Sequence, residues 1–161
     1  MSAPPQQQPL SDNLCWLLSR ASWTLTTELT AAMEDLGLSP RAHSVLAAAV
    51  TGEHTQTELA QMVGLDKTTM VVTMDELEAK GLAERRPSPS DRRARVNAVS
   101  EAGKRTAAKA DAVIEDVQTN VLESLPARDR KHFLEALAQL VCGRLGDPAA
   151  CKSRPRRRSP R

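Results

Sequence analysis

Three arginines and one aspartate lie close together in the segment PSPSDRRARV at residues 87–96: Asp91, Arg92, Arg93 and Arg95. Guanidinium groups form paired hydrogen bonds with phosphate and carboxylate oxygens, so this cluster is suited to an acidic partner. The prolines and serines at positions 87–90 place it in a loop. An arginine-rich loop can also be only a solvated, solubilising surface. The surrounding sequence must therefore decide between these two interpretations.

Other reactive residue types do not form a recognisable catalytic or metal site. The sequence contains no nucleophile–base arrangement, phosphate-binding glycine loop or paired-acid motif. His43, His54 and His132 are not spaced as metal ligands, and the cysteines include no C-x-x-C pair. We therefore predict that the chain is not an enzyme and that it needs no metal or cofactor.

Positive charge is concentrated in two places, although the formal net charge is only +2. Residues 152–161 hold six basic residues and no acidic ones, and residues 80–105 hold eight basic residues against three acidic ones. Charge localised in this way indicates an acidic partner at two positions. The basic tail at 147–161 either adds nonspecific attraction to DNA or is only a soluble end, and the sequence leaves both open.

The sequence predicts a cytoplasmic protein without a membrane segment. No apolar run approaches the roughly 20 residues of a membrane span, and the N-terminus lacks the features of a signal peptide. Three scattered cysteines are typical of a reducing compartment. The proline-rich and glutamine-rich residues 1–9 and the tail at 147–161 are expected to be disordered, which leaves one domain at 10–146.

Two helices are expected before the chain reaches its central region. Leucines and alanines recur at helical spacing over 10–36, and Gly37 ends that helix. Ser39 is a helix N-cap, and Pro40 at the first helical position begins a second helix that runs through Val50.

The next segment predicts a helix-turn-helix. Residues 55–58 (TQTE) form a capping box before a short apolar helix that ends near Val63. Gly64 turns the chain, and Asp66 caps a further helix over 67–80. Two short helices joined by a tight glycine turn are typical of DNA-binding proteins.

The arginine-rich loop is predicted to be the tip of a β-hairpin. Residues 82–86 and 95–99 alternate as two strands on either side of it. Helices follow over 101–146, the last of them beginning at Pro126. The helical segments 10–36 and 101–146 exceed what one small domain must bury, so we expect them to pack together and against a second subunit.

Helix 67–80 has one face for the core and one for a partner. Met70, Met74 and Leu77 share the core side. Its exposed side is expected to contact phosphates and base edges in the major groove, and Val71 or Val72 could touch a thymine methyl group. The alternative is an ordinary amphipathic surface helix. Because the helix is itself net acidic, binding must draw much of its electrostatic attraction from the neighbouring arginines.

The ordered set of motifs resembles the winged helix-turn-helix core of the MarR family of bacterial repressors. The resemblance is detailed over 55–104, with E-L-A at 58–60, D-K-T-T at 66–69 and L-E-x-x-G-L at 77–82. It extends loosely over 10–145 through the order of the helices. It implies a mainly α fold with a small β-hairpin wing, a DNA-binding core at 39–100, and dimerisation helices at 10–36 and 101–146.

The resemblance also implies roles for individual residues. In this family the wing enters the minor groove, so Arg93 corresponds to the inserted arginine and Asp91 to the acid that holds it. Arg92 and Arg95 could reach phosphates or acidic groups of the wing, while Arg85 and Arg86 lie on the incoming strand. The full set of expected DNA-binding residues is Thr55, Gln56, Thr57, Lys67, Thr68, Thr69, Val72, Thr73, Arg85, Arg86, Asp91, Arg92, Arg93 and Arg95.

The segment NLCWLL at 13–18 is also similar to the organic-hydroperoxide regulators within the same family, whose reactive cysteine lies at the position of Cys15. In those regulators tyrosines hydrogen-bond the cysteine sulfur. This chain contains no tyrosine and has Leu29 and Pro40 at the matching positions. A peroxide sensor needs a stabilised thiolate. The sequence leaves open whether Cys15 is a redox sensor or a buried structural cysteine.

Trp16 and Trp23 share a face of the first helix because they are seven residues apart. They could line the effector cleft that the resemblance implies, or they could belong to a dimer core. Taken together, these patterns predict a homodimeric repressor that binds a pseudo-palindromic operator in double-stranded DNA and is released by a small ligand or by oxidation. The alternative is a nonspecific, architectural DNA-binding protein.

Overall fold

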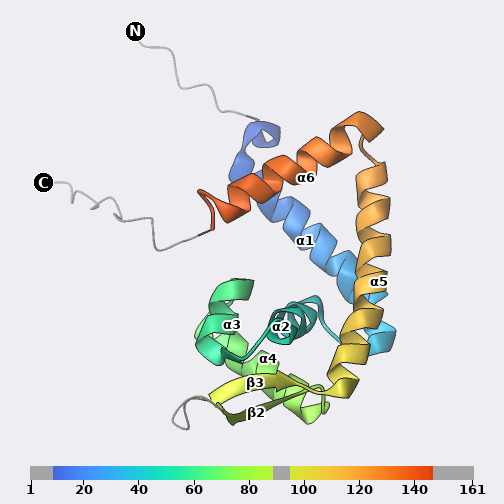
Figure 1. Cartoon of the computed structure of the whole chain (residues 1–161). Coiled ribbons are helices and arrows are strands. Elements are labelled where there is room, and N and C mark those ends of the chain that lie inside the picture. Colours follow the sequence, from blue (N-terminus) through green and yellow to red (C-terminus); the bar gives the residue numbers. More distant parts are fainter. Residues whose placement is uncertain (1–8, 89–94, 147–161) are drawn as a thin grey trace, which may run out of the picture. The chain divides into compact units, whose positions relative to one another are not determined.

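Helices account for most of the structure, a computed structural model that describes residues 9–88 and 95–146 (Figure 1). The chain forms two compact units, Met1–Val117 and Gln118–Arg161. The elements in chain order are η1 (Leu10–Asp12), α1 (Leu14–Ala32), η2 (Glu34–Leu36), α2 (Pro40–Val50), β1 (His54–Thr55), α3 (Gln56–Val63), α4 (Lys67–Ala79), β2 (Ala83–Pro87), β3 (Arg95–Val99), α5 (Glu101–Glu123) and α6 (Ala127–Cys142). The predictions of disorder at both chain ends lie outside the described residues, Pro9 excepted.

The first helix is shorter than the sequence predicts. Asn13 begins α1, because its side-chain oxygen accepts a hydrogen bond from the Trp16 N–H at 2.9 Å. At the other end Met33 leaves helical geometry and is completely buried. The separate turn η2 then leads to Gly37, which adopts a left-handed conformation at φ 59°. The helical spacing of the leucines continues across Asn13 and across Met33. Periodicity alone therefore does not show where α1 begins or ends.

The helix-turn-helix follows the predicted caps. Ser39 caps α2, and its hydroxyl accepts a hydrogen bond from the Ala42 N–H. The capping box of α3 is confirmed, since the Thr55 N–H donates to Glu58 Oε2 at 2.7 Å and the Glu58 N–H donates to Thr55 Oγ1 at 3.3 Å. Gly64 then turns the chain with φ 70°, and α4 follows.

The hairpin strands pair antiparallel as predicted, from Ala83 opposite Val99 to Pro87 opposite Arg95. The sheet has a third strand that the sequence did not predict, because β1 adds to the other edge of β3 and gives the order β1-β3-β2. The Asn97 side chain, 3% exposed, donates to the His54 carbonyl at 3.2 Å. Strand β1 has two residues, too few for an alternating apolar and polar pattern in the sequence. It is recognised only by its pairing with β3.

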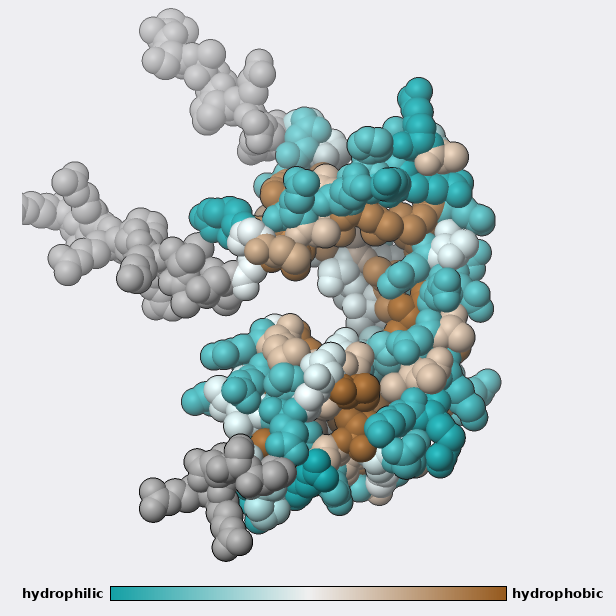
Figure 2. All heavy atoms as spheres, in the orientation of Figure 1, coloured by the Kyte–Doolittle hydropathy of each residue, from teal (hydrophilic) through white to brown (hydrophobic). Residues whose placement is uncertain are grey.

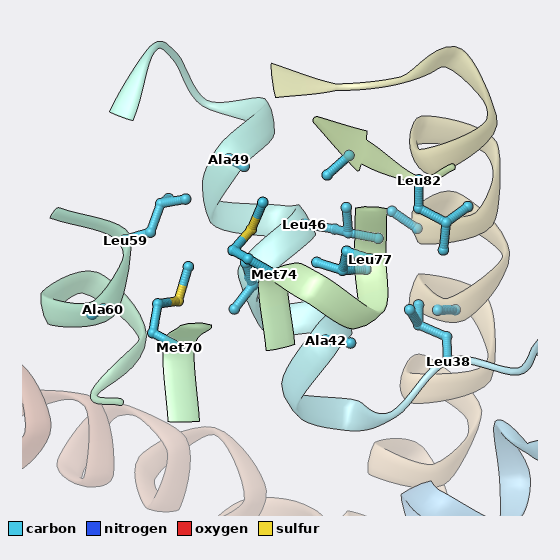
Figure 3. Packing of buried hydrophobic residues seen from close by; sticks show 14 of the residues in the cluster. Leu38, Ala42, Leu46, Ala49, Leu59, Ala60, Met70, Met74, Leu77 and Leu82 are labelled. Carbon is cyan, nitrogen blue, oxygen red and sulfur yellow. The ribbon is translucent and has the colours of Figure 1, made fainter. Parts of the chain in front are cut away.

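The core of the first unit lies between α2, α3, α4 and the start of the hairpin, as Figure 3 shows. The predicted stripe of α4 is confirmed, since Met70 and Met74 are fully buried and Leu77 is 1% exposed. Figure 3 shows Met74 and Leu77 beside Leu46 of α2, and Met70 beside Leu59 and Ala60 of α3. Packing this stripe inward fixes which face of α4 remains outside.

Helix α5 begins against the hairpin. The Ser100 hydroxyl donates to the Gly81 carbonyl at 2.7 Å and accepts from the Gly103 N–H at 2.9 Å. Gly103 is buried, and a Cβ atom built on it would lie 2.0 Å from the Leu82 carbonyl oxygen. The start of α5 therefore contacts the hairpin backbone at a distance that only glycine permits.

The second unit contains the end of α5 and helix α6. No residue of α6 is buried within this chain, although the helix has a predominantly apolar side (Figure 2). Its large exposed apolar residues are Phe133, Leu134, Leu140 and Val141. None of the helices in the described part of the chain has the length and apolar character needed to cross a membrane.

Candidate nucleic-acid interface

The N-terminus of α4 presents Lys67 and Thr68 to solvent. Asp66 caps the helix, and its carboxylate accepts hydrogen bonds from the Thr69 N–H at 3.0 Å and the Thr69 hydroxyl at 2.6 Å. These bonds, the hydroxyl first, lower the pKa of Asp66 below its ordinary value of 3.8. Thr69 is thus engaged in the cap, while Thr68 keeps its hydroxyl at the surface.

The outward face of α4 combines a hydroxyl with apolar groups. Val71 is 44% exposed and Val72 is 50% exposed, and both lie within one turn of Thr68. Asp75 follows on the same face and is also exposed. A face of this kind suits thymine methyl groups and base edges better than it suits phosphates.

Thr73 does not belong to this outward face, which corrects the sequence-based prediction. It is 2% exposed, and its hydroxyl donates to the Thr69 carbonyl at 2.8 Å. Position 73 is three residues after Met70 and four before Leu77, so it belongs to the core stripe. Its side chain supports the helix backbone and has no access to a partner.

Three predicted contact residues lie at the start of α3, and their surroundings differ. Thr55 is engaged in the capping box, and Gln56 accepts a hydrogen bond from Arg85 Nε at 3.3 Å. Thr57 is exposed. Hydrogen bonds from the Thr55 backbone and hydroxyl lower the pKa of Glu58 below its ordinary value of 4.5.

Arg85 is held inside the first unit, although it was expected at the DNA surface. Its side chain is only 19% exposed and forms ion pairs with Asp75 at 2.8 Å and with Glu78. It also donates to Gln56 and, through its second terminal nitrogen, to the Val71 carbonyl at 3.4 Å. Its own backbone N–H donates to Glu78 Oε1 at 2.7 Å. Arg85 therefore connects β2 to both helices of the helix-turn-helix.

Two further cations in the described part of the hairpin, Arg86 and Arg95, are more accessible. The Arg86 side chain is 49% exposed and forms an ion pair with Glu53 at 3.3 Å. Arg95 is exposed at the start of β3, opposite Pro87. The predicted wing residues Asp91, Arg92 and Arg93 lie outside the described residues. Arg86 and Arg95 are thus the predicted contact arginines that the described part of the hairpin presents to solvent.

The acidic excess of α4 is offset in part by its neighbours. Asp66 lies at the positive end of the helix dipole, and Asp75 and Glu78 pair with Arg85. Sequence reasoning did not assign a role to Asp75 or Glu78. A usable signal was present, however: an acidic cluster late in the helix, followed by an arginine at the start of the next strand.

A groove of about 1050 Å³ lies along α1 in the first unit, bounded by η2, residues 37–39 and Lys80. Trp23 lines it, whereas Trp16 does not lie among its described lining residues. The Arg20 guanidinium lies 4.9 Å from the centre of the Trp23 ring. Six of its lining residues carry a hydroxyl group: Ser19, Ser22, Thr26, Thr27, Thr30 and Ser39. Of these hydroxyls, those of Thr27 and Thr30 donate to carbonyls of α1, and that of Ser39 caps α2.

The Lys80 side chain connects the groove to α4. Lys80 is the C-cap residue of α4, and its ammonium group donates to the Gly37 carbonyl. Lys80 also lines the groove, where it provides a positive charge. The sequence did not suggest this role for Lys80, because the contact joins residues 43 positions apart.

Cys15 is an exposed free thiol at the start of α1, so it is not buried within the single chain. Cys142 near the end of α6 is also exposed and free. Within the described ranges, no group of three or more histidine, cysteine or acidic residues is arranged to hold a metal ion.

Comparison with known proteins shows a consistent similarity. A family model described as MarR family matches residues 36–94. A MarR-family transcriptional regulator from Rhodococcus sp. RHA1 is 30% identical, with a TM-score of 0.75, over 83% of this chain and 96% of that one. CouR from Rhodococcus jostii RHA1, solved with p-coumaroyl-CoA, is 32% identical, with a TM-score of 0.73, over 83% and 95% of the two chains. The transcriptional repressor CouR was also solved on a 23-mer DNA duplex. That structure is 27% identical to this chain, with a TM-score of 0.74, over 88% of this chain and 100% of that one.

Proposed function

The chain belongs to the MarR family of transcriptional regulators, and from that premise we propose that it is a homodimeric repressor binding a pseudo-palindromic DNA operator. One observation carries the proposal. The outward face of α4 presents Lys67, Thr68 and Val72, and the adjoining hairpin strands present Arg86 and Arg95. A helix in the major groove with cations beside it combines base reading with phosphate binding.

Homodimerisation is supported by the apolar residues that the single chain leaves uncovered. Leu14 and Leu17 of α1 are 55% and 42% exposed, and Phe133 and Val141 of α6 are 49% and 53% exposed. Soluble monomers rarely leave such residues together on a helix face. A two-fold dimer would present two α4 helices about one DNA turn apart, which suits a pseudo-palindromic operator.

Release by a small molecule is the form of regulation that the groove beside α1 supports. Its lining offers an aromatic ring in Trp23, several serine and threonine side chains, and charges of both signs in Lys80 and Glu34, which suits an aromatic compound with polar groups. Because CouR was solved with p-coumaroyl-CoA, this thioester is the first compound to test. Release by oxidation would instead act through the exposed Cys15 thiol. In that case Cys15→Ser would abolish the effect of peroxide on DNA binding.

The proposal is tested by a fluorescence-anisotropy titration near physiological salt. DNA from upstream of the protein's own gene is compared with a scrambled duplex of equal length, and a selection from random duplexes supplies an operator located elsewhere. A preference of about 10³ or more establishes a specific regulator. Equal affinity for all duplexes, with a steep salt dependence, would instead support an architectural protein whose arginines bind only phosphate.

A further inference from the structure

We propose that Arg85 is a positioning residue for DNA binding: it pairs with two carboxylates of the recognition helix α4, offsets part of their negative charge, and holds the wing strand β2 against that helix without touching DNA. The inference rests on the proposed DNA-binding function. It assigns Arg85 a role different from that of Arg86 beside it, although both are arginines on the same strand.

The contacts of Arg85 leave little of its guanidinium for a partner. All three of its side-chain nitrogens contact acceptors within the first unit: Nε contacts Gln56, one terminal nitrogen contacts Asp75 and Glu78, and the other contacts the Val71 carbonyl. Reaching a phosphate would require breaking these contacts and leaving two carboxylates unpaired. The neighbouring Arg86 is 49% exposed, and within residues 9–88 and 95–146 it pairs with Glu53 at 3.3 Å.

The position of the carboxylates explains why their pairing matters. Asp75 lies one turn after Val71 and Val72, on the outward face of α4, and is 61% exposed at its side chain. A helix that enters the major groove passes between two rows of phosphates. An unpaired carboxylate there would repel DNA of any sequence, whereas an ion-paired carboxylate would do so far less.

The same contacts also fix the wing. The Glu78 carboxylate accepts from both the backbone N–H and the side chain of Arg85. The Val71 carbonyl and Gln56 anchor the same side chain to α4 and α3. The wing and the recognition helix must contact adjacent grooves of one duplex together, so their relative position contributes directly to affinity.

The test compares Arg85→Gln with the triple variant Arg85→Gln/Asp75→Asn/Glu78→Gln by anisotropy titration at several salt concentrations. The single variant should bind about tenfold more weakly or worse. The triple variant should return to within about threefold of the wild type, with the remaining loss due to the weaker anchoring of β2, and it should keep the wild-type salt slope. A triple variant that stays as weak as the single one, with a slope shallower by about 0.9, would show that Arg85 contacts a phosphate. Unchanged binding by Arg85→Gln would also overturn the proposal.

Arg86→Gln is the matched control, because it removes one positive charge from the same strand. Its salt slope should fall, and Glu53→Gln should not restore it. Thermal unfolding checks that each variant is folded. If Arg85→Gln does not fold, the triple variant alone decides through its salt slope, because positions 75 and 78 then carry no charge that has lost its arginine partner. The comparison also works on a scrambled duplex, so it remains decisive even if wild-type binding proves nonspecific.

Discussion

The threonines of the recognition helix show how residues of one type divide between structure and recognition. Thr69 donates to the Asp66 cap, and Thr73 donates to the backbone inside the core. Thr68 remains at the surface beside the exposed Val71 and Val72. The surface that can read bases is therefore narrower and more apolar than the sequence KTTMVVT suggests.

Val72 should contact a thymine methyl group, because it is half exposed on the outward face of α4. Replacing that thymine by uracil removes one methyl group and should weaken wild-type binding by about 0.8 kcal/mol, or roughly fourfold. The Val72→Ala variant should bind both duplexes almost equally. Uracil at a position outside the selected operator serves as the control. An equal loss in the wild type and in Val72→Ala would assign the methyl contact to another residue.

At the scale of elements, the helix-turn-helix depends on two carboxylates at helix N-termini. Glu58 and Asp66 both accept hydrogen bonds from threonines, and both have pKa values lowered by those bonds. A carboxyl group with a lowered folded-state pKa stabilises the fold above its unfolded-state pKa. That contribution is lost as the pH falls through the folded-state pKa.

Asp66→Asn separates capping from titration, because asparagine also caps helices but carries no charge. The wild type should be more stable than Asp66→Asn at neutral pH. This difference should shrink as the pH falls below 3.8, the ordinary pKa of Asp66, because the protonated carboxyl group loses its favourable interaction with the helix dipole. Urea unfolding at a series of pH values measures the difference. A difference that does not vary with pH would show that the charge of Asp66 contributes nothing.

The junction between the hairpin and α5 should tolerate no side chain at Gly103. Its Cβ would lie 2.0 Å from the Leu82 carbonyl oxygen and 2.8 Å from Val99 Cγ1, so Gly103→Ala should reduce the free energy of unfolding by about 2–3 kcal/mol. Gly52→Ala is the control, because its Cβ would meet nothing nearer than 3.5 Å. That change should stay within about 0.5 kcal/mol. Equal stability of the two variants would contradict the close packing.

At the scale of the whole molecule, the apolar side of α6 requires a partner that the single chain does not provide. We expect this face to lie in the homodimer interface. Leu134 is 48% exposed in the chain, so Leu134→Glu would place an unpaired charge in that interface and should weaken dimerisation at least about tenfold. Sedimentation equilibrium measures the change.

Gln139→Glu is the control for this prediction, because it adds the same charge at an exposed polar position of α6. It should remain dimeric. If Leu134→Glu also remains fully dimeric, the interface must lie on other residues. If the wild type is a monomer at every accessible concentration, the homodimeric part of the proposed function is wrong.

The sequence by itself determined the features that depend on neighbours within a few positions. The caps at Ser39, Thr55 and Asp66 and the turn at Gly64 are local, because each is formed by hydrogen bonds or backbone geometry across three or four residues. The buried stripe of Met70, Met74 and Leu77 follows from helical periodicity. Together with the hairpin strands and the ordered motifs that resemble the MarR family, these features predicted the winged helix-turn-helix fold.

Only the tertiary structure decided features that join residues far apart in the chain. Strand β1 exists through its pairing with β3, Lys80 contacts Gly37 across 43 positions, and Arg85 meets Gln56 across 29. The same packing gave Arg85 its acidic partners. Periodicity shows that a residue lies on one face of a helix. Which groups meet across that face depends on how the elements pack, and packing is a property of the folded chain.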